Sequence, residues 1–143
     1  MVCLGNICRS PLAHGIMQAK IEEKRLQWEV DSAGTSSFHS GSAPDPRSIK
    51  EASIHNLDIT HQRSREIKAT DLQYYDLILT MDTSNYNNVR KLITDNSQLD
   101  KIKLILNYVN PGQNRSVPDP YYEGGFPKVY EMLEKAIDRI TEN

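Results

Sequence analysis

The C-terminal segment has the clearest helical pattern in the chain. Apolar residues occupy positions 129, 132, 133, 136, 137 and 140, which is the spacing of one face of an α-helix, and Pro127 lies in its first turn. Residues 12–24 repeat the pattern and predict a helix directly after Pro11. Pro46 begins a third predicted helix that runs to about residue 55, and Asp82 caps a fourth over residues 85–93.

Short apolar segments between these helices predict strands. Residues 75–81 form a nearly continuous apolar run, which is typical of a strand buried on both faces. Residues 28–32 alternate apolar and polar positions, and residues 101–106 form a further short strand. Because strands and helices alternate, we predict an α/β fold with three layers, αβα, around a small parallel sheet of about four strands. In such sheets ligands bind at the loops that follow the carboxyl ends of the strands.

Size and charge exclude several functional classes. The 143 residues fit one domain, which we expect to span residues 1–143. With 17 Lys and Arg against 19 Asp and Glu, the chain is no general binder of nucleic acid or of membrane surfaces. The sequence has no signal peptide and no apolar stretch long enough to span a bilayer, and its two cysteines lie in one loop. We therefore expect a cytoplasmic protein.

The candidate chemistry lies in a loop near the N-terminus. It has the pattern C-x5-R-S-P and consists of Cys3, Leu4, Gly5, Asn6, Ile7, Cys8, Arg9, Ser10 and Pro11. A loop that turns directly into a helix points backbone N–H groups inward and adds the positive end of the helix dipole, so it can bind a phosphate-sized anion. Arg9 can donate to two oxygens of that anion at once. The same positive field favours the thiolate of Cys3, which implies phosphoryl transfer to sulfur.

A second candidate is Asp119, because transfer to sulfur needs an acid that protonates the leaving oxygen. Pro118 and Pro120 flank this residue and stiffen the loop that carries it. Tyr121 and Tyr122 follow directly and could form the wall of a pocket for an aromatic ring.

The chain resembles the low-molecular-weight protein tyrosine phosphatase family in two distant motifs, VCLGNICRSP and DPYY. The resemblance extends across nearly the whole chain through two further motifs, V-D-S-A-G-T and M-D-T-S-N. It implies a hydrolase in which Cys3 is the nucleophile, Arg9 binds the phosphate and the transition state, and Asp119 is the general acid and then the general base. The phosphate loop would join the first strand to the first helix. No metal or other cofactor is expected, since loop amides and Arg9 stabilise the charge. The implied partners are a phosphotyrosine-containing protein and phosphate or other oxyanions, bound by a monomer.

The resemblance also implies roles for the residues around the nucleophile. Ser10 would donate a hydrogen bond to the thiolate, and Asn6, which tolerates left-handed backbone angles, would hold the loop through bonds that reach Ser32. Cys8 could form a reversible disulfide with Cys3 that protects the thiolate, but a small apolar core residue is an equally good interpretation of Cys8.

Three further positions bear on the substrate. Phe38 matches an aromatic pocket wall of the family, and His39 follows it at a place associated with substrate preference. Ile7 resembles the tyrosine-directed members, whereas a smaller threonine there is similar to arginine-phosphatase relatives. A phosphoarginine phosphatase and an arsenate reductase on the same fold are therefore alternatives. A non-catalytic phosphate-binding or redox-sensing module is a third, although such a module would not need the acid Asp119.

Two features depart from the family pattern. Only Met1 and Val2 precede Cys3, so the first strand is cut short, and we expect the given residues to begin inside it. The segment from His61 to Arg65 is one residue longer than in the family, which leaves the role of His61 open.

Overall fold

A sheet of four parallel strands forms the centre of the computed structural model, which describes residues 1–142. The strands lie in the order β2-β1-β3-β4, and their bounds are β1 Val2–Cys3, β2 Ala33–Gly34, β3 Ile78–Thr80 and β4 Ile102–Leu104. Val2 pairs with Ala33 on one side and with Thr80 on the other. The short β1 is therefore a central strand, and the predicted α/β fold with a parallel sheet is confirmed.

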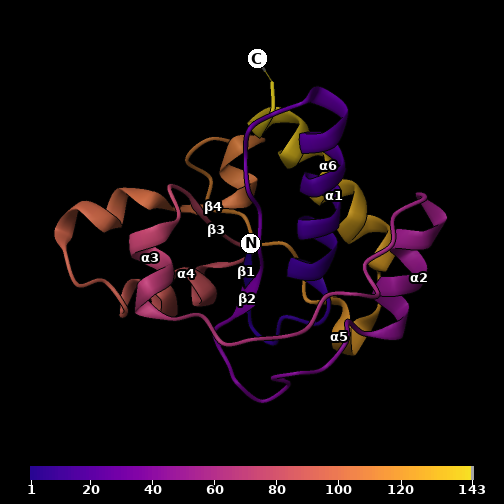
Figure 1. Ribbon diagram of the computed structural model, residues 1–143, viewed down its shortest axis with the longest axis horizontal. Coiled ribbons are helices and arrows are strands. Elements are labelled where there is room, and N and C mark those ends of the chain that lie inside the picture. The colour runs from indigo at the N-terminus through magenta and orange to yellow at the C-terminus, as the bar shows by residue number, and fades with distance from the viewer. Residues whose placement is uncertain (143) are drawn as a thin grey trace.

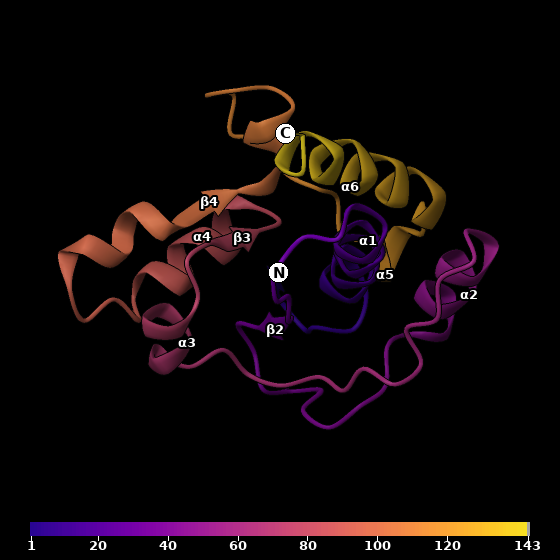
Figure 2. The ribbon, with the colours of Figure 1, turned by 45° about the horizontal axis from the view of Figure 1, so that its top comes forward.

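Helices cover both faces of this sheet (Figure 1). Helix α1 packs against α6 on one face, with α2 beside them, and Figure 2 shows α1 end-on beneath α6. Helices α3 and α4 lie on the opposite side of the sheet. The helix bounds are α1 Arg9–Lys24, α2 Pro46–Ile54, α3 Ala69–Tyr74, α4 Thr83–Arg90, α5 Pro120–Glu123 and α6 Phe126–Ile140, and the two 3-10 helices are η1 Asn96–Lys101 and η2 Ile105–Tyr108.

Each face of the sheet has its own apolar core. The larger core includes the buried face of α6, whose residues Val129, Leu133 and Ile137 match the predicted periodic positions. The smaller core lies on the other face and centres on Leu72 and Val89. No helix in residues 1–142 is long and apolar enough to cross a bilayer.

Several local predictions need correction. Residues 28–32 form no strand: the ladder with β1 consists of Ala33 and Gly34, which pair with Val2 and Cys3. Helix α3 was not predicted, since it has only six residues and buries only Leu72. Helix α1 begins at Arg9, three residues before the predicted start, so the phosphate loop runs directly into it.

The loops after the strands converge at the carboxyl edge of the sheet. The amide of Ser36, after β2, donates to Leu4 O at 2.9 Å, and the amide of Met81, after β3, donates to Val2 O at 3.2 Å. The amide of Val117 in turn donates to Met81 O at 2.8 Å. These bonds bring the segments near residues 4–8, 35–39, 81–82 and 117–122 to one place.

Candidate active site

The candidate nucleophile, Cys3, ends β1 at the base of the phosphate loop. Its sulfur is buried, lies 3.1 Å from Ser10 Oγ and accepts a hydrogen bond from the Asn6 amide at 3.3 Å. The Asn6 amide is a donor to the sulfur, and Ser10 Oγ can donate to it or accept from it.

Asn6 holds the shape of this loop. Its backbone has a φ of 55°, in the left-handed region that asparagine tolerates better than most residues. Its side-chain amide donates to Ser10 Oγ at 2.7 Å and to Ser32 Oγ at 3.0 Å, and its carbonyl accepts from the Arg65 amide at 3.1 Å. Ser32 Oγ also lies 3.3 Å from Nδ1 of the partly buried His14, so the network extends one residue further than the sequence indicated.

The loop presents open backbone donors at the start of α1. The amides of Gly5, Ile7 and Cys8 donate to no atom of residues 1–142. The first turn of α1 contains no acidic residue, and Cys8 caps it without a side-chain hydrogen bond. The positive end of the helix dipole is therefore free to act on a bound oxyanion.

Arg9 is buried and held by two oxygens from other segments. Its Nη1 donates to Asp82 Oδ2 at 2.8 Å and to Val117 O at 2.9 Å, and its Nη2 lies 3.6 Å from Asp119 Oδ2. Nη1 is thus occupied, whereas Nε and Nη2 remain to meet an anion. The sequence indicated Asp82 only as a helix cap and not as a partner of Arg9. The position of Asp82 directly after a buried strand is the feature that could have pointed to the site.

The candidate acid, Asp119, lies opposite the phosphate loop. It caps the short helix α5, where its Oδ1 accepts from the Tyr121 amide at 3.1 Å, and its side chain is partly exposed. The candidate acid therefore lies within ion-pair distance of Arg9.

Aromatic side chains form the mouth of a cavity of about 340 Å³ above the phosphate loop. The Phe38 and His39 rings meet edge to face at 4.8 Å, as do those of Tyr121 and Tyr122 at 4.9 Å. Phe38 and Tyr122 are the most exposed of the four, at 86% and 82%. The predicted residues Asn6, Ser10 and Ser32 do not line the cavity, and Ser36, which does, was not predicted. The lining is Cys3, Leu4, Gly5, Ile7, Cys8, Arg9, Ser36, Phe38, His39, Asp119, Tyr121 and Tyr122.

Cys8 lines this cavity, whereas His61 does not. Cys8 is a free thiol packed in the larger core, and burial, followed by nearby carboxylates, raises its pKa to about 12. His61 is exposed and does not line the cavity. Its segment instead reaches the phosphate loop through Ser64, whose hydroxyl donates to Gly5 O at 3.0 Å, and through the amide of Arg65.

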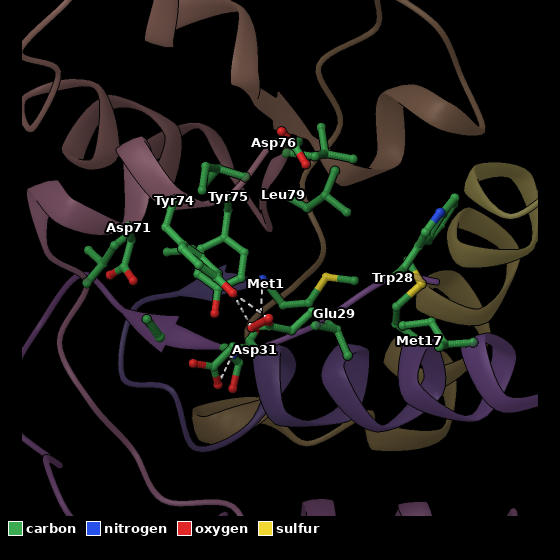
Figure 3. Close-up of a pocket in the computed structure, with 18 of the residues that line it drawn as sticks. Met1, Met17, Trp28, Glu29, Asp31, Asp71, Tyr74, Tyr75, Asp76 and Leu79 are labelled. Carbon is green, nitrogen blue, oxygen red and sulfur yellow. Dashed lines mark hydrogen bonds between the residues drawn. The ribbon is translucent and has the colours of Figure 1, made fainter. Parts of the chain in front are cut away.

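A larger cavity, of about 620 Å³, opens at the amino ends of the strands, away from the phosphate loop (Figure 3). Trp28, Tyr74 and Tyr75 line it, and the Met1 ammonium donates to Asp31 O there at 3.0 Å. No cysteine lines it. Within residues 1–142, no group of three or more His, Cys, Asp or Glu side chains is placed to hold a metal ion. The smaller cavity is therefore the candidate active site.

The fold and the loop define the class of protein, an α/β phosphatase that binds a phosphoryl group in a cysteine-containing loop. The model of the low molecular weight phosphotyrosine protein phosphatase family matches residues 1–143, and the chain belongs to this family. A Synechocystis protein provisionally named as a low molecular weight protein-tyrosine-phosphatase is 42% identical in an alignment of 143 positions, which covers 97% of this chain and 90% of that protein.

Solved structures show the same fold. A protein tyrosine phosphatase from Entamoeba histolytica superposes with a TM-score of 0.90 at 34% identity, over 97% of this chain and 90% of that one. A Drosophila arginine phosphatase superposes with a TM-score of 0.90 at 32% identity, over 97% of this chain and 92% of that one. The protein is thus a phosphatase whose family takes phosphoproteins as substrates and binds phosphate.

Proposed function

We propose that this phosphatase hydrolyses phosphotyrosine through a phosphocysteine formed on Cys3. The observation that carries the proposal is the convergence of Cys3 and Arg9, from the phosphate loop, and Asp119, from a distant segment of the chain, on one aromatic-rimmed cavity. A module that only bound phosphate would need the loop and the arginine, but not a carboxylate facing them.

In the first step, the Cys3 thiolate attacks phosphorus, so that an S–P bond forms while the bond from phosphorus to the tyrosyl oxygen breaks. Asp119, in its protonated form, gives its proton to that oxygen, and tyrosine leaves as a neutral phenol. The loop amides and the free donors of Arg9 stabilise the charge on the three phosphoryl oxygens.

In the second step, water attacks phosphorus and the S–P bond breaks. Asp119, now a carboxylate, takes a proton from the water, and inorganic phosphate leaves. The electron pair returns to Cys3 as a thiolate, which Ser10 stabilises from 3.1 Å. Asn6 and Ser32 act by holding Ser10 and the loop in place.

The cavity favours an aromatic substrate. Phe38, His39, Tyr121 and Tyr122 can pack against a phenyl ring, since aromatic pairs are most stable in offset or edge-to-face arrangements. The buried Ile7 in the cavity wall narrows the space for the longer, charged side chain of phosphoarginine. We propose that the protein acts as a single-domain monomer over residues 1–143, in the cytoplasm, where its two free thiols would stay reduced.

Phosphoarginine hydrolysis is the second candidate, because an arginine phosphatase shares the fold at 32% identity. Arsenate reduction has less support, since Cys3 and Cys8 are the only cysteines of the chain and Cys8 is held as a buried thiol of raised pKa.

A substrate panel tests the proposal. Phosphotyrosine, phosphoserine and phosphoarginine peptides are offered to the protein in EDTA, and release of phosphate is followed; arsenate is offered with a thiol reductant in a parallel assay that follows arsenite. We expect turnover of phosphotyrosine, and none with Cys3→Ser. Preferred hydrolysis of phosphoarginine would overturn the substrate assignment, and substantial turnover by Cys3→Ser would overturn the role of the nucleophile.

A further inference from the structure

We infer that Arg47 is a positioning residue that holds the acid-bearing loop against the phosphate loop. The inference rests on the proposed role of Asp119 as general acid. Arg47 does not line the cavity above Cys3, so it acts through other residues and not on the substrate.

On one side, Arg47 binds Asp45, and Asp45 and Ser48 are hydrogen-bonded to the phosphate loop. It forms a two-pronged ion pair with Asp45, with Nε 3.0 Å from Oδ1 and Nη2 2.9 Å from Oδ2. The Asp45 amide donates to Ile7 O at 2.8 Å, and Ser48 Oγ donates to Cys8 O at 3.1 Å. The start of α2 is therefore bonded to two carbonyls of the phosphate loop.

On the other side, Arg47 reaches the helix that follows the acid. Its Nη2 donates to Tyr121 O at 3.1 Å, and its guanidinium lies 5.6 Å from the centre of the Tyr121 ring and 4.9 Å from that of Phe126. Tyr121 is also the residue whose amide binds Asp119 Oδ1. One planar guanidinium thus joins Asp45 on the phosphate-loop side to Tyr121 on the acid side, a geometry that the single ammonium of lysine cannot reproduce.

The segment from Asp119 to Gly125, which carries the proposed acid, makes few side-chain hydrogen bonds to other parts of the chain. Helix α5 has only four residues, and Gly124 and Gly125 follow it with φ values of 76° and 84°. A Cβ at either glycine would meet no atom within 4 Å, so this end of the segment lies in open space. Within residues 1–142, the bond from Arg47 to Tyr121 is the only side-chain hydrogen bond that joins α5 to another segment.

Leaving-group dependence distinguishes a positioning role from general damage. The value of kcat/KM is measured for aryl phosphates with good and poor leaving groups in Arg47→Met, Arg47→Lys and Asp119→Ala, and in the double variant of Arg47→Met with Asp119→Ala. Poor leaving groups need the acid, which typically contributes about 10²- to 10⁴-fold. We expect Arg47→Met to lower kcat/KM about tenfold for poor leaving groups and little for good ones, with Arg47→Lys in between.

The control is Lys50→Gln, which removes the same charge from the same helix at an exposed position and should leave kcat/KM unchanged. If Arg47 acts only through the acid, Arg47→Met should have no further effect in the Asp119→Ala background. An equal loss for all leaving groups, or the same tenfold loss without the acid, would overturn the inference. If Asp119→Ala itself left the leaving-group dependence unchanged, the proposed acid would be wrong, which is a separate outcome.

Discussion

Replacing Gly34 by alanine should displace the phosphate loop, although the substitution itself changes no candidate catalytic residue. Gly34 ends β2 directly beside the loop, where a Cβ would lie 2.7 Å from Leu4 O and 3.2 Å from both the amide nitrogen and the Cβ of Asn6. The first contact is with backbone, which cannot rotate away. Gly34 is itself fixed, because its amide donates to Arg65 O and its carbonyl accepts from the Ile67 amide, both at 2.8 Å.

The geometry sets the size of the effect. Ordinary contact begins at 3.4 Å, so Leu4 and Gly34 must separate by 0.7 Å. A displacement of this order moves the Asn6 amide that binds the Cys3 sulfur. Misplacement of about 1 Å costs up to about 100-fold in rate, so we expect kcat/KM to fall about 10- to 100-fold. Overpacking of this kind typically costs about 1–3 kcal/mol in the free energy of unfolding.

The assay combines kcat/KM for p-nitrophenyl phosphate with urea unfolding of the same preparations. Gly112→Ala is the matched control: its Cβ would meet no atom within 4 Å, but its φ of 75° imposes strain of about 1–2 kcal/mol. We expect this variant to lose stability and to keep its kcat/KM. Wild-type kcat/KM and stability in Gly34→Ala would show that the loop yields freely and would refute the reasoning.

Two further predictions concern charged groups around the phosphate loop. Asp82→Asn removes the carboxylate that holds Arg9 Nη1 at 2.8 Å, and charged hydrogen bonds are about twice as strong as neutral ones. Inhibition by inorganic phosphate should therefore weaken about tenfold. The control is Asp95→Asn, which also changes a helix cap, and an unchanged inhibition constant for Asp82→Asn would contradict the prediction. Burial lowers the pKa of His14 from 6.5 to about 4. The unfolded chain therefore takes up a proton on His14 at a higher pH than the folded protein does. The free energy of unfolding should fall as the pH drops from 6.5 towards 4, by up to about 1.4 kcal/mol per pH unit. His14→Gln should reduce this slope in urea titrations, and an equal slope in both proteins would contradict the prediction.

Local patterns in the sequence predicted the elements that depend on local physics. Helix α6 follows from the spacing of its apolar residues, and the cap at Asp82 from its place before a helical segment. Contacts between side chains that are far apart in the sequence could not be predicted in this way. Arg9 and Asp82 are 73 positions apart, and Arg47 and Tyr121 are 74 apart, so no sequence window contains either pair. Residues 28–32 have the alternation of a strand, but the ladder with β1 contains only Ala33 and Gly34.

The contacts of the buried Arg9 bear on both steps of the proposed mechanism. A buried guanidinium needs a charged partner, and Asp82 provides one through Nη1 while leaving Nη2 near Asp119. A phosphate dianion that enters the loop would compete with Asp119 for Nη2. The substrate and the proposed acid would therefore use the same side of the guanidinium. In the proposed second step, after tyrosine has left, the Asp119 carboxylate would again lie beside Arg9 Nη2. Asp82 thus leaves the remaining face of Arg9 to the substrate and the acid in turn.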